Sequence, residues 1–278
     1  MAETLALTAN SLRRLVCKPR FYVALLLTAG SLLLIFQNVP AFLRENSLTV
    51  QAAEPFLLVT VNRLSQLLLV LSFLLLCGDA PFFHAGMEIV FARTNKRRWL
   101  CAQILTVFAV TALWLLFALA VSILFFLPRV SFSNEWSVYL KTAARMRFGS
   151  IAVGLRGVDA GMGLLQNGKP WLVFAVSFLY NLLLFGFCGV WAVLLNLYTK
   201  RSYGSLLIVS FCALRLALGS LYPIPALERV SPMNLTDLRA FELNLSGAAH
   251  TVLFFTVQIA LLWILSCLRL RRLDMFTR

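Results

Sequence analysis

Residues 99–127 read WLCAQILTVFAVTALWLLFALAVSILFFL, an uninterrupted apolar run without one charged side chain. As an α-helix, these 29 residues would extend about 43 Å at 1.5 Å per residue. The hydrocarbon core of a bilayer is about 30 Å thick and is crossed by about 20 residues. The run therefore predicts a membrane-spanning helix that tilts or protrudes from the bilayer.

The composition of the whole chain agrees with this interpretation. Of its 278 residues, 60 % are hydrophobic and 13 % are charged, against about 45–50 % and about 25 % in an ordinary soluble domain. Too few polar side chains remain to cover a water-facing surface, so a soluble enzyme is excluded first. The abundance of Phe and Leu also excludes a disordered chain.

Five further apolar stretches have the length of a spanning helix. The six predicted spans are 21–38, 62–78, 99–127, 171–197, 203–222 and 249–268. Lys and Arg concentrate on the short connecting segments that lie inside if the N-terminus is cytoplasmic, which is the orientation that the positive-inside rule favours. We therefore expect one all-α transmembrane domain over residues 1–278, multi-pass in the cell membrane, with both termini cytoplasmic.

The net charge of +14 has the same explanation, because basic side chains at the inner face meet anionic membrane lipid. Nucleic acid is not an expected partner, since the chain has no basic platform with interleaved aromatics and no zinc-finger spacing. The six cysteines include no CxxC pair and predict buried free thiols.

Residues 1–20 predict an amphipathic helix that lies on the cytoplasmic membrane surface before the first span. Its apolar residues recur at helical spacing, at Leu5, Ala9, Leu12, Leu15 and Val16. Basic residues follow, and Pro19 ends the helix.

A second amphipathic helix is predicted over residues 81–95, between the second and third spans. Asp79 is a candidate cap for it, and Pro81 suits its first turn. Its apolar side chains include Phe83, Met87, Val90 and Phe91, which share one face. That face needs a cover, which is either a groove of a partner protein or lipid and the chain's own spans.

Four features, taken in order, resemble the transmembrane subunits of bacterial ABC transporters of the ABC-2 exporter type. An interfacial helix precedes the first span. The stretch GDAPFF…ARTNKRRW (78–83 and 92–99) is similar to the family's Asp-x-Pro, helix, Arg, basic cluster and Trp. The segment NEWSVYLKTAA (134–144) contains a Trp-Ser pair, and SPMNL (231–235) contains Ser-Pro before the last span. The resemblance covers nearly the whole chain.

This resemblance implies a pore-forming subunit, not an enzyme, paired with a second copy or a paralogous permease. It implies no cofactor bound by this chain, with ATP and Mg on separate nucleotide-binding ATPase subunits. The absence of a GxxxxGK[ST] phosphate loop agrees. It also assigns 81–95 as the coupling helix that docks on the ATPase, with candidate contact residues Pro81, Phe82, Phe83, His84, Met87, Glu88, Phe91 and Arg93.

Polar side chains inside a bilayer are costly and are candidates for a translocation path. The candidates here are Arg63, Asn181, Arg215 and Gln258. Hydrogen bonds between helices explain the two amides without any substrate, and Arg215 can nearly reach the outer surface by snorkelling. His84 and Glu88 have helical metal-ligand spacing, but zinc requires three or four ligands, so we predict no metal site.

The outer loop over 129–170 is long enough to be functional. It contains a predicted amphipathic helix over residues 136–146 and is either a lid over the exit or a passive connection. The alternative function for the whole chain is an ATP-independent secondary transporter or channel. The lack of an acidic residue in the middle of any predicted span counts against a proton-driven mechanism.

Overall fold

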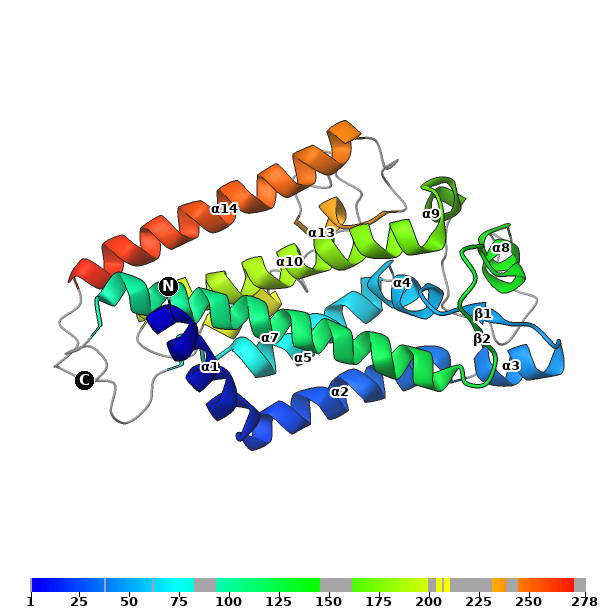
Figure 1. Cartoon of the computed structure of the whole chain (residues 1–278), viewed down its shortest axis with the longest axis horizontal. Helices are drawn as coiled ribbons and strands as arrows, with labels where there is room; N and C mark the ends of the chain where they lie inside the picture. The colour runs from blue at the N-terminus through cyan, green and yellow to red at the C-terminus, as the bar shows by residue number, and fades with distance from the viewer. Residues whose placement is uncertain are drawn as a thin grey trace.

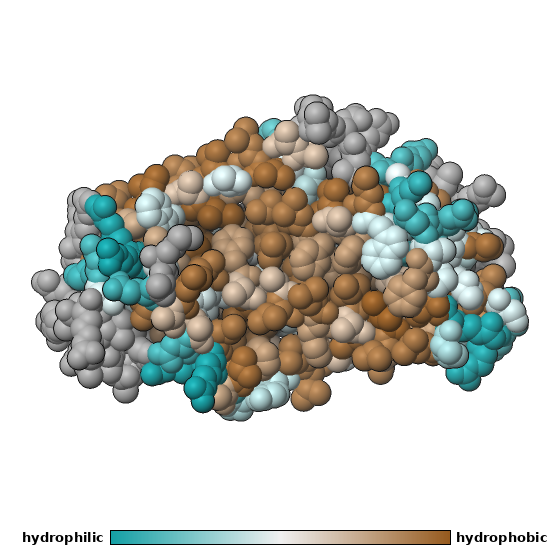
Figure 2. Space-filling view, in the orientation of Figure 1, coloured by the Kyte–Doolittle hydropathy of each residue, from teal (hydrophilic) through white to brown (hydrophobic). Residues whose placement is uncertain are grey.

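The computed structural model describes residues 2–37, 39–61, 63–82, 94–145, 162–199, 204–206, 208–210, 232–238 and 245–272. Within these residues the chain forms a bundle of long helices (Figure 1). Figure 2 shows that hydrophobic residues cover the middle of the visible face, with hydrophilic residues gathered at the two ends.

Among the described residues, four helices are long and apolar enough to cross a membrane. They are α2 (Pro19–Phe36), α7 (Lys96–Phe125), α10 (Pro170–Thr199) and α14 (Leu245–Arg272). The pair α4 (Glu54–Val61) and α5 (Arg63–Cys77) bends by 87° and makes a fifth span if both helices are counted as one. The chain is therefore a multi-pass helical membrane protein by helix length and hydropathy.

Four of the predicted spans are confirmed, at 21–38, 99–127, 171–197 and 249–268. The predicted span at 62–78 corresponds to α5, but α4 precedes it and was not predicted. The predicted span at 203–222 lies largely outside the described residues, of which 204–206 and 208–210 are helical. A total of six spans therefore stays a prediction.

The two ends of the bundle differ in charge. We call one the basic end, because it holds α1 (Ala2–Val16), the Lys96–Arg98 start of α7 and the arginines that end α14 (Figure 1). The opposite end holds the short elements and is called the loop end. In Figure 1, α10 and α14 both run toward the basic end, and α1 and the last turn of α14 lie at that same end.

The N-terminal helix α1 packs against the start of α7. The hydroxyl of Thr8 donates to the carbonyl of Ala102 at 3.3 Å, and the Arg98 guanidinium pairs with the Glu3 carboxylate at 3.0 Å. Of the predicted apolar face, Leu15 is buried and Leu5 is 55 % exposed. The prediction that a helix ends before Pro19 is confirmed, since α1 stops at Val16 and α2 begins at Pro19.

Short elements gather at the loop end. They are α3 (Val39–Glu45), β1 (Val50–Gln51), β2 (Val130–Ser131), α8 (Val138–Arg145), α9 (Met162–Gln166) and α13 (Pro232–Leu235). The strands pair in parallel, with Val50 opposite Val130. The predicted amphipathic helix over residues 136–146 is confirmed as α8. The strand pair was not predicted, because two residues carry no readable alternation.

Three helices of the bundle, α2, α5 and α7, are joined by buried hydroxyl groups. The Trp114 indole N–H of α7 donates to the Thr28 hydroxyl of α2 at 2.9 Å, and Thr28 bonds the Ser72 hydroxyl of α5. Ser72 in turn donates to the carbonyl of Ala24 at 2.8 Å. Because no water reaches these buried groups, such bonds fix the rotation of each helix against its neighbours.

Helix α10 lies at the centre of the bundle and packs against α4, α5, α7 and α14. In its most apolar stretch 61 % of residues are buried, against 28 % in α2 and 22 % in α14. Close approach to α7 depends on glycine: a Cβ on Gly189 would lie 2.4 Å from Cγ1 of Val107. Small residues at such contacts let helix backbones pack tightly in a membrane.

We predict that Gly189→Ala destabilises the protein by about 1–3 kcal/mol, because the stiff Val107 side chain cannot move away from the added methyl group. The measurement is the apparent melting temperature of the detergent-solubilised protein. The matched control is Gly30→Ala in α2, where a Cβ would meet nothing within 4 Å and which should melt no lower than the wild type. An equal fall in both variants would contradict the close contact between α7 and α10.

Candidate functional site

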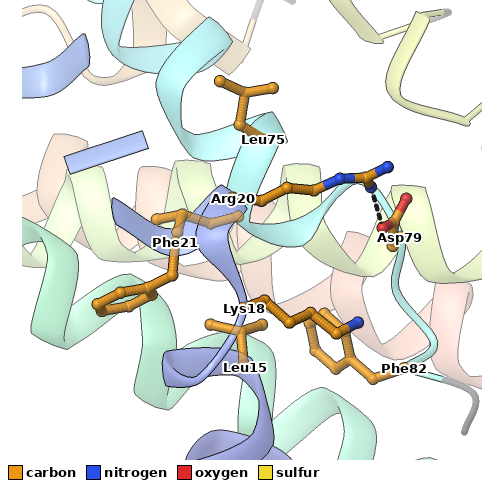
Figure 3. Close-up of a pocket in the computed structure, with 8 residues that line it drawn as sticks. Leu15, Lys18, Arg20, Phe21, Leu75, Asp79 and Phe82 are labelled. Carbon is orange, nitrogen blue, oxygen red and sulfur yellow. Dashed lines mark hydrogen bonds and ion pairs between the residues drawn. The ribbon is translucent and has the colours of Figure 1, made fainter. Parts of the chain in front are cut away.

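The turn that follows α5, residues Gly78–Phe82, lies at the basic end (Figure 1). It includes Pro81 and Phe82, the first two residues of the predicted coupling segment, and Figure 3 shows it in close-up. The guanidinium of Arg20, on α2, pairs with the carboxylate of Asp79. The Arg20 side chain is 63 % exposed, and surface ion pairs contribute at most about 1 kcal/mol. This pair therefore orients the turn more than it stabilises the fold.

Two buried amides hold the same turn from other helices. The backbone N–H of Phe82 donates to Oε1 of Gln103, on α7, at 3.0 Å. Nδ2 of Asn196, on α10, donates to the carbonyl oxygens of Gly78 at 2.7 Å and Ala80 at 2.6 Å. Side chains of α2, α7 and α10 thus fix the backbone of the turn by which α5 leads into the predicted coupling segment.

A shallow depression beside the turn is lined by both apolar and charged side chains: Leu15, Lys18, Arg20, Phe21, Leu75, Leu76, Asp79 and Phe82. Figure 3 shows Lys18 extending beside Phe82, with Arg20 directed toward Asp79. The depression has room for roughly one water molecule. It is therefore too small to hold a transported molecule, and it is a surface feature of the turn.

The described residues include only two of the predicted docking residues, Pro81 and Phe82. Pro81 is buried and Phe82 is half-buried, but neither is helical, so the prediction that Pro81 begins a helix is wrong. Phe83, His84, Met87, Glu88, Phe91 and Arg93 lie outside the described residues. Helix α7 begins at Lys96, three residues before the predicted span, because Oδ1 of Asn95 caps it by accepting the N–H of Arg97 at 3.1 Å.

Asn181 lies inside the bundle, on the side of α10 that faces α4. Its Nδ2 donates to the Ser177 carbonyl at 2.8 Å, and the Ser177 hydroxyl bonds that of Thr60 at 3.2 Å. Its Oδ1 is buried and has no hydrogen-bond partner within the part of the chain that the structure describes. These contacts favour a role in the seam between helices, while a role in a translocation path stays a prediction.

Among the described residues, no hydrogen bond joins Asn181 to the other polar candidates, Arg63 and Gln258. Gln258 is half-buried on α14, and Arg63 is the first residue of α5. Arg215 lies outside the described residues. In the described ranges, no three His, Cys, Asp or Glu side chains come close enough together to hold a metal ion.

Sequence reasoning missed a buried acid at the loop end, Glu54, which is the first residue of α4 and is fully buried. One carboxylate oxygen accepts the backbone N–H of Ser137 at 2.6 Å, and the other accepts the Ser137 hydroxyl and the N–H of Gln51 at 3.2 Å. The Glu-Pro pair at 54–55 is the sequence signal for this helix start.

The Trp-Ser pair at 136–137 bonds to three other segments of the loop end. The Ser137 hydroxyl caps α8 by accepting the N–H of Leu140 at 3.1 Å, and the Trp136 indole N–H donates to the Gly168 carbonyl at 2.7 Å. Burial raises the pKa of Tyr139, and the nearby Glu54 carboxylate raises it further. The loop between α7 and α10 is therefore fastened to α4 through one carboxylate.

The chain matches no protein-family model, no curated protein and no solved structure. Its class is defined by the helices themselves, which make it a transmembrane helical protein.

We predict that Glu54→Gln destabilises the protein by about 1.5–3 kcal/mol, the range for hydrogen bonds to a charged group. Whichever way the new amide turns, its NH₂ meets a backbone N–H, that of Ser137 or that of Gln51. Thermal unfolding measures the loss, with Glu135→Gln on the exposed surface of the same loop as the control. If the two variants unfold at the same temperature, the carboxylate does not fasten the loop.

Proposed function

We propose that this chain is the pore-forming transmembrane subunit of an ATP-driven exporter of the ABC-2 type. In this proposal separate ATPase subunits bind ATP and Mg and dock on residues 81–95. The observation that carries it is the fixed turn Gly78–Phe82, which is held by Arg20, Gln103 and Asn196 from three helices. A docking segment can pass force to the spans only if its base is firmly attached to them.

The distribution of charge supports the orientation. Basic residues dominate the end that holds α1, the start of α7 and the end of α14. The positive-inside rule therefore favours a cytoplasmic basic end, and with it cytoplasmic termini and six spans. The predicted docking segment then faces the compartment that holds ATP.

The exposed apolar surface supports a second pore-forming chain beside lipid. Large hydrophobic side chains are exposed along the spans, among them Leu26 at 71 %, Leu34 at 63 % and Leu253 at 63 %. Lipid would cover part of this surface, and a second copy or a paralogue would cover the rest. In the resembling family, ATP draws the two ATPase subunits together, and the docking helices pass that movement to the paired spans.

We predict that Phe83→Asp with Phe91→Asp lowers the amount of co-purifying ATPase by about tenfold or more, since buried aromatic anchors at interfaces cost over 2 kcal/mol each. The readout is quantitative mass spectrometry of the protein purified in mild detergent. Phe132→Asp is the matched control, because Phe132 is 69 % exposed at the loop end. ATPase retained at the wild-type level in the double variant would contradict docking at 81–95.

A further inference from the structure

One buried side chain joins two separate stretches of backbone at the basic end. Asn196, on α10, is 7 % exposed. Its two N–H bonds go to the carbonyls of Gly78 and Ala80, and its Oδ1 accepts the N–H of Gly204 at 3.0 Å. The amide therefore uses its donors on the turn after α5 and its acceptor on the helical residues 204–206.

The fit around this amide is tight on both sides. A Cβ on Gly204 would lie 2.8 Å from Oδ1 of Asn196, and a Cβ on Gly78 would lie 3.2 Å from Cβ of Ser205. The turn and the helical residues Gly204 and Ser205 thus lie directly against each other and against Asn196. Because the site is buried, water does not compete for these hydrogen bonds. The turn, Asn196 and residues 204–206 are therefore held together as one unit.

The two stretches have different positions in the transport scheme. The turn leads along the chain into the predicted docking segment, whereas Gly204 stands at the start of the predicted span 203–222. We propose that Asn196 is a positioning residue that passes displacement of the turn to the helical residues 204–206. This rests on the proposed function, because the docked ATPase supplies the displacement.

The sharpest variant is Asn196→Asp. A carboxylate still accepts the N–H of Gly204, but it has no donor for the turn and it repels the carbonyl oxygens of Gly78 and Ala80. Gly204→Ala loosens the same link from its other side and serves if Asn196→Asp folds poorly. Asn46→Asp is the matched control, an identical chemical change on the exposed surface of the loop end.

The test is hydrogen–deuterium exchange of the complex with its ATPase in lipid nanodiscs, with and without ATP and Mg. In the wild type and in Asn46→Asp, nucleotide should change exchange both in the turn and in residues 204–206. In Asn196→Asp the ATPase should still co-purify and the turn should still respond, while the response at 204–206 falls by about threefold or more. An undiminished response at 204–206 in both Asn196→Asp and Gly204→Ala would overturn the proposal.

A second experiment separates this link from the proposed function. If no ATPase accompanies the wild type, the proposed function fails, and the link is tested on the chain alone with Gln103→Leu, which removes the acceptor of the Phe82 N–H. That change should raise exchange at 78–82 and at 204–206 when Asn196 is present, and at 78–82 alone in the Asn196→Asp background. Exchange at 204–206 that ignores Gln103→Leu in the presence of Asn196 would overturn the link.

Discussion

The burial of α10 is the constraint on which the rest of the bundle depends. This helix contacts α4, α5, α7 and α14, so each of them is positioned by the shape of its surface. Membrane helices gain little from the hydrophobic effect when they associate, and close packing has to supply the attraction. Gly189 allows that close packing against Val107 of α7. At the basic end, Asn196 of the same helix hydrogen-bonds the turn that follows α5.

Buried side chains hold the backbone at both ends of the bundle, but the chemical groups that do so differ. At the loop end, the Glu54 carboxylate accepts N–H and O–H groups and fastens a long loop to α4. At the basic end, the neutral Asn196 amide both donates and accepts, so it can join two backbone stretches at once. Each arrangement satisfies buried backbone groups that would otherwise cost free energy in a medium without water.

Hydropathy predicted the long helices because crossing a bilayer imposes a length and an apolar composition that can be read locally, as in residues 99–127. Pro19 marked the boundary between α1 and α2 for an equally local reason, whereas the Asn95 cap that starts α7 at Lys96 was not predicted. The bonds of Glu54 to Ser137, of Gln103 to Phe82 and of Asn196 to Gly78 were not predictable, because each joins residues that lie 21 to 118 positions apart along the chain. The Trp-Ser pair was noticed as a motif, but its contacts follow only from the folded loop end.

The central claim is that this membrane chain works with a separate ATPase. The most direct measurement is to cross-link the chain in its native membrane, purify it gently, identify every protein bound to it and assay ATP hydrolysis. The account predicts a stoichiometric partner with a phosphate loop and ATP hydrolysis by the complex. A chain that is alone or bound only to itself, with no ATPase after cross-linking, would contradict it and would favour an ATP-independent transporter or channel.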